Sequence, residues 1–210
     1  MAVSPRNKVK ASERARVTPK RRDREVLDAA AKVFYERGYA GASIQDVADE
    51  LGILKGSLYH YIDSKEDLLF RLLEQTHDDV DRILEEVVAE EGLAPLERLH
   101  LYVRRQVEYN VTSLQRVAVY YHDVDQLSEV RRRAIFGRRR VHERFVIDLI
   151  EQAQRDGTAD ASLDARVSSS NIFATIIWTY RWFRPREYKR QAVAEACATF
   201  AVRGIAPHPG

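Results

Sequence analysis

The sequence predicts an all-α protein of about nine helices. Apolar residues recur at helical spacing along most of the chain, and no segment shows a convincing two-residue alternation of the kind that marks a strand. Glycine, serine and proline divide this pattern where helices would end and begin. The 210 residues suffice for one large domain or two modest ones, so we expect a small helical head followed by a larger helical body.

The N-terminal segment differs in composition from the rest of the chain. Residues 1–20 contain few large apolar side chains, so we expect them to form a disordered basic tail. Residues 1–24 hold nine Lys or Arg and two acidic residues, although the whole chain has a net charge of only +2. A basic end on an acidic body favours a polyanionic partner there, but a merely solvated arm would have the same composition.

The first two helices are marked by apolar stripes and by the residues at their ends. One stripe runs over residues 26–34, and its helix is expected to end at Gly38. The next helix is expected over residues 44–51, where Ser43 is a suitable N-cap and Asp46 completes a capping box. A glycine follows each stripe, as expected at a helix C-terminus.

A short helix is expected next, at residues 55–62, and a longer one runs from its N-cap, Ser64, to about Glu90. Pro95 suits the first turn of the following helix, because a missing N–H needs no partner there. Four further helices are expected at residues 117–127, 128–157, 167–181 and 187–202. The third of these four is apolar on most sides, so we expect it to be buried.

The short helix has two unlike faces. On a helical wheel Leu58 and Ile62 point one way, and Lys55 stands at the free N-terminal end. The opposite face is small and polar, and consists of Gly56, Ser57, Tyr59 and His60. Two short helices joined by a tight, glycine-containing turn form a helix-turn-helix, whose second helix fits the major groove of DNA.

The surrounding sequence resembles the DNA-binding domain of the TetR family of repressors. The resemblance covers about residues 22–69 and includes the run FYERGYAGASIQDVADELGILKGSLYHYIDSKEDLL, from Phe34 to Leu69. Within it, the spacing G-x-x-x-G-x-L-Y-x-Y-x-x-S-K-E-x-L is among the more specific helix-turn-helix signatures. The resemblance implies a DNA-binding domain at residues 21–69, with a double-stranded DNA operator as its partner.

The resemblance also assigns roles to individual residues of this sequence. The family's base-contacting positions fall on Gln45, Lys55, Gly56 and Tyr59. Its phosphate-contacting positions fall on Ser43, Ser57, Tyr59, His60 and Lys65. Lysine can donate to guanine, and a lysine in the first turn of a helix favours a phosphate there. Leu54 stands where the family usually has Ser or Thr, which places one cap or phosphate contact in question.

TetR-like proteins join this head to a helical body that dimerises and binds a small molecule, which implies such a domain at residues 70–210. The last two helices would form the four-helix bundle of a homodimer. Small residues on the final helix would permit close approach, although they could equally belong to the internal core of one chain. They are Ala192, Ala194, Ala196 and Ala198.

Two features indicate a ligand class. The stretch VSSSNIFATIIWTYRWFRP, from Val167 to Pro185, resembles TetR-type repressors of sterol and fatty-acid breakdown that respond to acyl-CoA thioesters. Residues 131–144 hold seven arginines and one acid, and arginine suits the phosphates of coenzyme A. The expected acyl-CoA site includes Tyr102, Tyr109, Tyr121, Arg138, Arg139, Arg140, Phe145, Trp178 and Arg181.

Other interpretations remain open. The arginines could be solvated or paired with acids such as Glu85 and Glu86, and the tryptophans could be core residues. The effector could instead be an apolar, aromatic or cationic molecule, as in regulators of efflux or stress genes. An all-helical enzyme or carrier and a purely structural interaction protein belong to other classes, and binding to DNA from upstream of the protein's own gene would separate both from a repressor.

Catalysis, metal binding and membrane insertion have little support in the sequence. The six histidines show no metal-ligand spacing, and no glycine-rich loop is present to cradle a phosphate. Cys197 is the only cysteine, which excludes an intramolecular disulfide and fits a reducing compartment. The longest apolar run is too short to cross a bilayer, and the basic N-terminus lacks the apolar segment of a secretion signal. We expect a cytoplasmic protein that is not an enzyme and needs no cofactor or metal.

Overall fold

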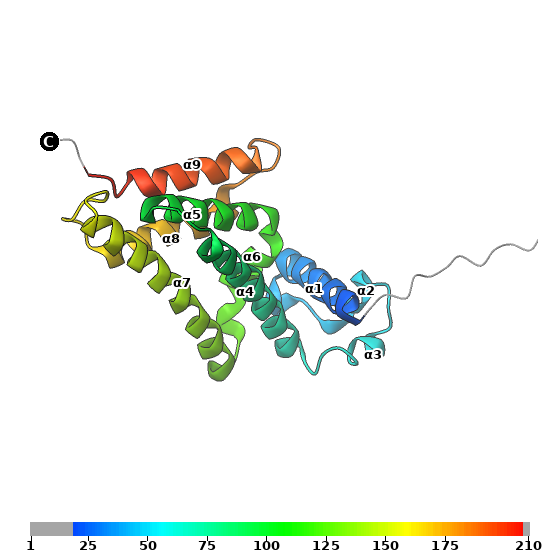
Figure 1. Ribbon diagram of the computed structural model, residues 1–210. Coiled ribbons are helices and arrows are strands. Elements are labelled where there is room, and N and C mark those ends of the chain that lie inside the picture. Colours follow the sequence, from blue (N-terminus) through cyan, green and yellow to red (C-terminus); the bar gives the residue numbers. More distant parts are fainter. Residues whose placement is uncertain (1–18, 208–210) are drawn as a thin grey trace, which may run out of the picture.

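The chain folds into helices alone over the part that the structure describes. The computed structural model describes residues 19–207, and within that range it contains nine α-helices, one short 3-10 helix and no β-strand (Figure 1). The prediction of an all-α fold with about nine helices is therefore confirmed. The basic tail expected at residues 1–20 lies almost entirely outside the described range. No helix within that range is both long and apolar enough to cross a membrane.

The helix boundaries follow the caps and glycines of the sequence. The helices are α1 (Pro19–Gly41), α2 (Ile44–Glu50), α3 (Lys55–Leu58), α4 (Lys65–Ala89), α5 (Pro95–Thr112), α6 (Leu114–Asp123), α7 (Glu129–Arg155), α8 (Ala165–Trp182) and α9 (Arg190–Arg203), and the 3-10 helix η1 (Val124–Gln126) follows α6. Gly38, inside the range of α1, has a φ of 70°, and Gly52, after α2, has a φ of 64°. Both angles lie in the left-handed region that favours glycine, so the chain turns at both predicted positions.

Several boundaries differ from the predicted ones by a few residues, among them the end of α3 and the starts of α6 and α9. α3 ends four residues early, at Leu58, because tight turns follow it, and in one of them the Tyr61 amide donates to the Leu58 carbonyl at 2.9 Å. α6 begins three residues earlier than expected, at Leu114, and η1 continues it. α9 begins three residues late, at Arg190, because residues 184–188 form a turn.

A head made of α1, α2 and α3 packs onto the start of α4. Val47 of α2 and Leu58 of α3 are fully buried in its core. The same core includes Val119 and Tyr120 of α6 and Ile135 of α7. The head therefore shares one continuous apolar core with two helices of the body.

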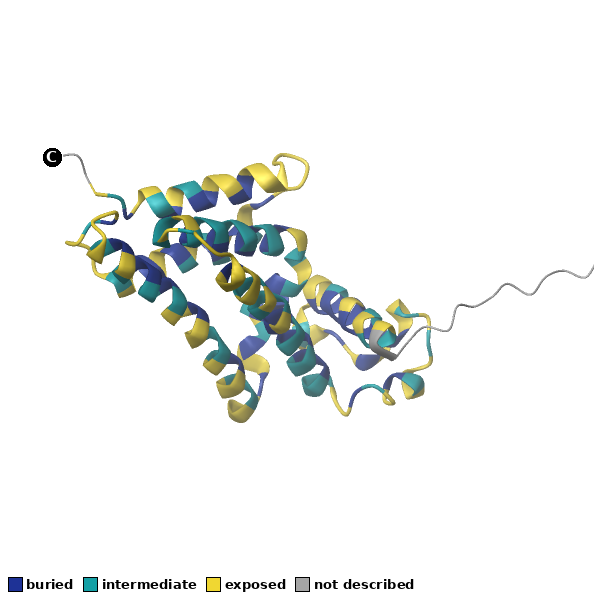
Figure 2. Cartoon of the chain, viewed as in Figure 1, coloured by how far each residue is buried: buried dark blue, intermediate teal, exposed yellow. Residues whose placement is uncertain are grey.

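The body is a bundle with α5 at its centre. α5 packs against α4, α7, α8 and α9, and α9 lies along its length (Figure 1). Figure 2 shows buried residues where the helices face one another and exposed residues on the outer sides of α7 and α9. Tyr102 and Val107 of α5 belong to this second core, together with Ile150 of α7 and Ile176 of α8. Each amphipathic helix buries one face, and this burial supplies most of the stability of such a bundle.

α8 is buried on one side only, which corrects the prediction that most of its sides are buried. Ile172, Ile176 and Thr179 face the core. On the opposite side Val167 is 60% exposed and Trp178 is 59% exposed. The apolar composition of this helix therefore reflects an inner face in the core and an outer apolar face that is open in the single chain.

Candidate functional site

The helix-turn-helix presents one face of α3 to solvent. Leu58 is fully buried and anchors the short helix on the head. Around it Lys55, Gly56, Tyr59 and His60 are exposed, and Ser57 is half-buried. Figure 1 shows α3 at the edge of the molecule, next to α2 and away from the body. This face carries the donors and the small residue that a recognition helix needs in a major groove.

Ser43 organises the start of α2. Its hydroxyl accepts a hydrogen bond from the Asp46 amide at 3.2 Å, while its own amide and hydroxyl donate to the Asp46 carboxylate at 2.7 and 2.6 Å. The predicted capping box is therefore confirmed. These hydrogen bonds hold the pKa of Asp46 below its ordinary value, and an ion pair with Arg37 lowers it further.

Gln45 and Lys65 flank α3 along the chain. Gln45 is exposed and its amide donates to the Asp49 carboxylate at 2.7 Å, so it must exchange this partner to reach a base. Lys65 is the first residue of α4, and its ammonium lies 4.3 Å from the centre of the Tyr39 ring. This contact keeps the positive charge beside the free amides of a helix N-terminus, where a phosphate binds favourably.

The caps of α3 and α4 differ. Leu54 is the N-cap of α3, makes no side-chain hydrogen bond to the helix and is 79% exposed. By contrast, the Ser64 hydroxyl caps α4 by accepting from the Asp67 amide at 3.0 Å. A leucine cannot supply the oxygen that Ser or Thr would, so this chain lacks the usual cap at the start of α3.

A cavity of about 90 Å³ lies in the body between five helices. α4 contributes Thr76, His77 and Val80, α5 contributes Tyr102, Gln106, Tyr109 and Asn110, and α6 contributes Val117, Tyr120 and Tyr121. α7 contributes Arg139, His142 and Glu143, and α8 contributes Phe173, Ile176 and Ile177. Aromatic and aliphatic walls with a few polar groups are typical of a small-molecule site.

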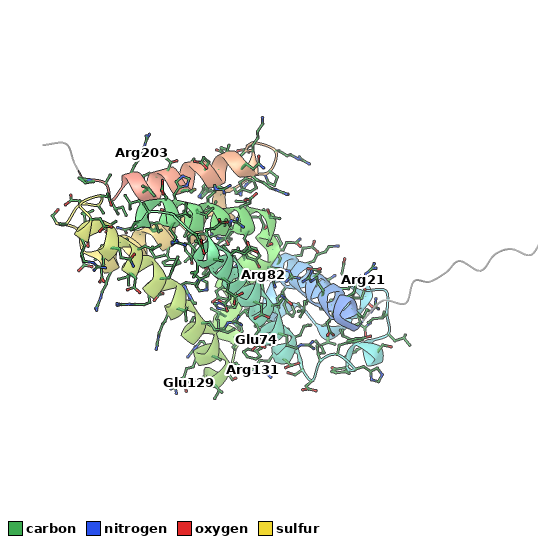
Figure 3. All side chains as sticks on the ribbon, viewed as in Figure 1. Arg21, Glu74, Arg82, Glu129, Arg131 and Arg203 are labelled. Carbon is green, nitrogen blue, oxygen red and sulfur yellow. The ribbon has the colours of Figure 1, made fainter. Side chains whose placement is uncertain are left out.

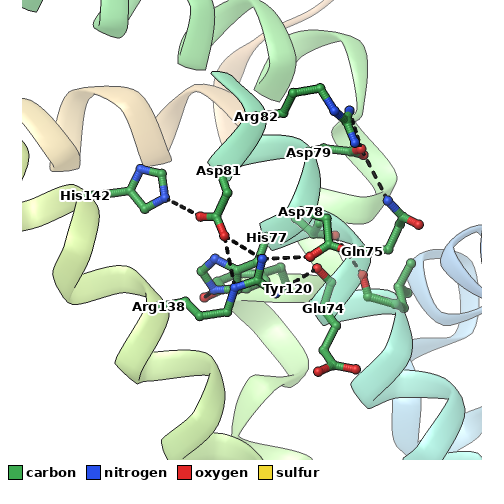
Figure 4. Close-up of polar contacts among 12 residues, drawn as sticks. Glu74, Gln75, His77, Asp78, Asp79, Asp81, Arg82, Tyr120, Arg138 and His142 are labelled. Atoms are coloured by element: carbon green, nitrogen blue, oxygen red, sulfur yellow. Dashed lines mark hydrogen bonds and ion pairs between the residues drawn. The ribbon is translucent and has the colours of Figure 1, made fainter. Parts of the chain in front are cut away.

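A network of polar side chains borders the cavity (Figure 4). The Asp81 carboxylate on α4 accepts hydrogen bonds from His142 at 2.7 Å and from the Nε of Arg138 at 3.2 Å, both on α7. The Nδ1 of His142 lies 2.9 Å from the Tyr102 hydroxyl. Burial raises the pKa of Asp81, but the hydrogen bonds from Arg138 and His142 outweigh burial, so the pKa is lowered overall. This chain of bonds ties α4, α5 and α7 together.

Two other polar side chains at the cavity are incompletely bonded. His77 is 5% exposed, and its Nε2 lies 2.9 Å from the Tyr120 hydroxyl, while its Nδ1 has no partner. Gln106 is 4% exposed and its amide nitrogen has no partner either. Where side chains are described, no other buried side-chain N or O atom lacks a hydrogen bond. Burial, with a smaller effect of Arg138, lowers the pKa of His77 to about 4, so its imidazole is neutral at pH 7.

The structure brings four of the nine predicted ligand residues to the cavity wall. They are Tyr102, Tyr109, Tyr121 and Arg139. The Arg139 guanidinium lies 5.4 to 5.9 Å from the ring centres of Phe136, Tyr120 and Tyr121. Arginine is therefore held at this wall by aromatic rings, where its charge faces the cavity.

The other five predicted ligand residues do not line the cavity. They are Arg138, Arg140, Phe145, Trp178 and Arg181. Arg138 is paired with Asp78 and Asp81, which neutralise its charge. Trp178 lies on the exposed side of α8, and the Arg181 guanidinium is 5.7 Å from its ring centre.

Phe145 and Arg140 also lie outside the cavity wall. The Phe145 ring packs edge-on against the Tyr102 ring, with 5.3 Å between the ring centres. Phe145 therefore contacts a residue of the cavity wall without lining the cavity itself. Arg140 is exposed on α7. Sequence reasoning missed His77 and Gln106, which do line the cavity. Their only local signal is a polar residue in the apolar stripe of a helix, which does not by itself distinguish a cavity from a satisfied core position.

α6 contacts the cavity on one side and the head on the other. Val117, Tyr120 and Tyr121 line the cavity. On the other side α6 packs along α1, and the Nε of Arg116 lies 3.1 Å from the Asp28 carboxylate of α1. One short helix therefore connects the cavity wall to the head.

The start of α7 makes a second connection between body and head. Arg131, labelled near that end of α7 in Figure 3, bonds to Asp67 of α4 at 3.0 Å and lies 5.0 Å from the Phe70 ring centre. The Ser128 amide donates to the Glu66 carboxylate at 3.0 Å, and this bond lowers the pKa of Glu66. The first turn of α4, which follows the helix-turn-helix, is therefore fixed to the body.

The four alanines of α9 divide into two pairs. Ala194 and Ala198 are buried inside the chain, as in the internal-core interpretation. Ala192 and Ala196 are exposed, and they align at four-residue spacing with Phe200, which is 67% exposed. α9 therefore has an outer apolar stripe, as α8 has.

The described residues include no metal centre, and their one cysteine is not activated. Within residues 19–207, no group of three or more His, Cys, Asp or Glu residues is placed to hold a metal ion. Cys197 is buried in the core of the body, and burial raises the pKa of its thiol, which disfavours the reactive thiolate.

Known families and proteins have the same organisation. Residues 26–72 match the family described as bacterial regulatory proteins, tetR family, and residues 92–205 match the family described as tetracyclin repressor-like, C-terminal domain. The chain is 31% identical over 187 residues to the HTH-type transcriptional repressor KstR2 of Rhodococcus jostii, which covers 88% of this chain and 91% of that protein.

Several solved structures have the same fold as this chain. The ketosteroid transcriptional regulator KstR2 of Mycobacterium tuberculosis gives a TM-score of 0.82 at 29% identity, covering 89% of this chain and 96% of that chain. AibR, solved in complex with isovaleryl coenzyme A and operator DNA, gives a TM-score of 0.77 at 26% identity, covering 85% and 97%. The family matches over both parts of the chain identify a DNA-binding regulator rather than an enzyme. The chain belongs to the TetR family of bacterial transcriptional regulators.

Proposed function

We propose that this protein is a cytoplasmic, homodimeric repressor that binds a near-palindromic operator and is released from it by an acyl-CoA thioester. The observation that carries this proposal is the position of α6, which lines the cavity on one side and packs against α1 of the head on the other. A ligand that moves α6 therefore acts directly on the DNA-binding head.

On the DNA side, the proposed base contacts are Gln45, Lys55, Gly56 and Tyr59, and the proposed phosphate contacts are Ser43, Ser57, Tyr59, His60 and Lys65. Exposure supports this set, because all but Ser57 and Lys65 are exposed and those two are half-buried. Lys55 at the start of α3 can donate to the O6 and N7 of a guanine, and Gly56 lets the backbone approach the duplex closely. Lys65 at the start of α4 is a phosphate contact without base preference.

The proposed dimer uses the outer faces of α8 and α9. Val167 and Trp178 on α8 and Phe200 on α9 are all more than half exposed, which is unusual for large apolar side chains that lie on two neighbouring helices. Ala192 and Ala196 allow a second copy to approach closely. Two such helices from each protomer form a four-helix bundle, and a two-fold axis between them presents two recognition helices to a palindromic site.

For the effector, the cavity supports an acyl group, and Arg139 supports its anionic end. Arg139 is the one Lys or Arg side chain among the described cavity residues, and its neighbours are aromatic rings. We assign the phosphates of coenzyme A to Arg139 and to the exposed Arg140, and not to Arg138, whose charge is already neutralised. The complex of AibR with isovaleryl coenzyme A is a precedent within a similar fold. Trp178 is assigned to the dimer face instead.

Induction follows from the size of the cavity. Its volume of about 90 Å³ is below the roughly 150 Å³ of an engineered cavity that binds benzene, so a larger acyl group must displace the walls. Displacement of α6 moves α1 and changes the separation of the two recognition helices, which the DNA requires at roughly 34–36 Å. The ligand shifts this equilibrium only by the difference between its affinities for the two states.

A second class of effector is favoured by a different observation. Five of the residues that line the cavity are aromatic, and Glu143 also lines it, so an aromatic or cationic molecule would find suitable contacts there. Such an effector would make this protein a regulator of efflux or stress genes. It would not need Arg139 or Arg140.

A mobility-shift titration tests the proposal. DNA from upstream of the protein's own gene is the probe, and isovaleryl-CoA, isovalerate and free CoA are added in turn. We expect the thioester to release the DNA and the two fragments to act weakly, because each supplies only part of the contacts. A free acid as potent as its thioester would eliminate the CoA assignment and leave the second class standing. Equal affinity for unrelated DNA would contradict the repressor assignment itself.

A further inference from the structure

The cavity holds two hydrogen-bonding groups that the protein does not satisfy. His77 of α4 and Gln106 of α5 both line it, both are more than nine-tenths buried, and each has one side-chain nitrogen without a partner. Burying such a group without a partner carries a free-energy cost, so native proteins hold few of them. Two at one small cavity indicate that a bound molecule completes them.

The bonding of His77 decides what its free nitrogen offers. Its imidazole is neutral at pH 7, so one nitrogen carries a proton and the other accepts. If the Tyr120 hydroxyl donates to Nε2, only the Nδ1–H is left without a partner. If Nε2–H donates to the hydroxyl instead, both the Tyr120 proton and the Nδ1 lone pair are left. The first arrangement leaves fewer hydrogen-bonding groups unsatisfied, so we take the Nδ1–H as a donor that has no acceptor within the protein.

Gln106 offers a second donor at the same cavity. Its amide nitrogen, which can only donate, has no partner in the protein. Asn110, one turn further along α5, differs, because its amide already donates to the Ile176 carbonyl at 2.9 Å. A carbonyl oxygen has two lone pairs and can accept from both His77 and Gln106.

The charges at the cavity favour a neutral acceptor in its interior. A carboxylate taken out of water needs a cation beside it, and Arg139 is the one Lys or Arg side chain among the described cavity residues. The proposed function already assigns Arg139 to the anionic end of the effector. Arg138, the other nearby arginine, is neutralised by Asp78 and Asp81.

We propose that His77 and Gln106 form a subsite for a neutral carbonyl oxygen of the effector, so that the protein selects oxygenated molecules over hydrocarbons of the same shape. The proposal rests on the proposed function in one respect, since it takes the cavity as the effector site. Beyond the proposed function, we infer that the part of the effector inside the cavity carries a ketone or thioester carbonyl. His77 and Gln106 are the two residues that donate hydrogen bonds to this carbonyl.

Two small probes of nearly equal shape test this subsite. Acetone and isobutene differ by C=O in place of C=CH₂ and are smaller than benzene, and binding is followed through the carbon-13 methyl shifts of Val80, Val117 and Ile176 at the cavity wall. The affinity ratio of ketone to alkene is measured in the full-length protein and in the variants His77→Phe and Gln106→Leu. Thr179→Val is the matched control, because Thr179 is a buried, hydrogen-bonded polar residue like the other two but does not itself line the cavity.

We expect the ratio to fall roughly tenfold in each cavity variant and to stay at the wild-type value in Thr179→Val. Because the solvation of each probe is the same in every experiment, it cancels from this comparison. The same ratio in all four proteins would overturn the subsite while leaving the effector cavity standing. No shift of the cavity methyls with either probe would overturn the cavity as a binding site and the effector assignment with it. If His77→Phe does not fold, Gln106→Leu decides alone.

Discussion

The head and the cavity both present polar side chains to a partner, yet they are built in opposite ways. The head takes its polar groups from α2, α3 and the first residue of α4, all within residues 43–65, and holds them in solvent. The cavity takes its groups from five helices, between residues 76 and 177, and buries most of them. The head is therefore specified locally, whereas the cavity exists only when the whole body is packed.

The difference extends to how each site meets its partner. Polar groups of the head are solvated before DNA arrives, so binding exchanges water for phosphate and base contacts. At the cavity His77 and Gln106 are buried, and each has a side-chain nitrogen without a partner in the protein. A ligand that bonds to them meets groups that folding has already removed from bulk solvent.

Breaking the proposed dimer face is expected to have the largest effect. The double variant Trp178→Glu with Phe200→Glu places charges on the outer faces of α8 and α9 and should give a monomer at micromolar concentration. Operator affinity should fall roughly 10²- to 10⁴-fold, because two linked heads reinforce one another. Analytical ultracentrifugation measures the oligomeric state, and a DNA titration measures the operator affinity.

Val141→Glu is the matched control, since Val141 is as exposed as Trp178, at 59%, but lies on α7. Specific binding by a monomer with wild-type affinity would refute the dimer.

The buried histidine should make stability depend on pH. The pKa of His77 is about 4 in the folded protein and about 6.5 in the unfolded chain, so the unfolded chain takes up the proton first as the pH falls. Its contribution is complete above about pH 6.5 and is lost progressively toward pH 4, by about 3 kcal/mol at most. Urea unfolding of His77→Phe should show a weaker pH dependence in that window than wild type. Equal slopes for the two proteins would mean that His77 is not buried as the structure has it.

Substitutions of two lysines in the DNA-binding region should distinguish base contacts from phosphate contacts. Lys55→Ala should lose roughly 1–3 kcal/mol on the cognate site and discriminate less at one guanine. Lys65→Ala should weaken every DNA sequence about equally and reduce the salt dependence. Competition binding with a library of single-base operator variants measures both. The same specificity profile for the two variants would mean that α3 faces the DNA differently.

The smallest effect contrasts two neighbours on α5. Gln106→Leu removes an unsatisfied buried amide and should raise the free energy of unfolding by about 1 kcal/mol. Asn110→Leu removes an amide that is hydrogen-bonded to Ile176 and should lower it by about the same amount. Denaturant unfolding without ligand distinguishes the two signs. Destabilisation by both substitutions would mean that Gln106 is bonded in the free protein and would weaken the case for the carbonyl subsite.

The same contrast explains what the sequence could predict. Ser43, Gly52 and Ser64 signal helix ends within a few residues of themselves, so α1, α2 and α4 and the turn between α2 and α3 were predictable. The short length of α3 was not, because tight turns after Leu58 compete with helix at similar energy. In the body, Tyr102, Tyr109, Tyr121 and Arg139 line the cavity, and their role in ligand binding stays a prediction.

The remaining ligand residues could not be placed from local pattern alone. Whether Arg138 binds a ligand depends on Asp78 and Asp81, which lie about sixty residues earlier and reach it only through the packing of α4 on α7. The apolar segment around Trp178 predicts a core or pocket residue, but the orientation of α8 in the bundle places this side chain on the solvent-exposed face. The pairing of Arg138 and the orientation of Trp178 both depend on tertiary contacts, and helical periodicity in the sequence does not predict such contacts.

The central claim is that a ligand in the cavity moves the head through α6, and a distance measurement between the two heads tests it most directly. Spin labels are placed at Glu36→Cys, an exposed position on α1, in a Cys197→Ser background that leaves no other thiol. Electron–electron resonance then gives the label separation in the dimer, alone, with operator DNA and with isovaleryl-CoA. We expect DNA to narrow the distribution of label separations around one value, and the thioester to shift the distribution to another value. Release of the DNA by the thioester with an unchanged separation would contradict the account.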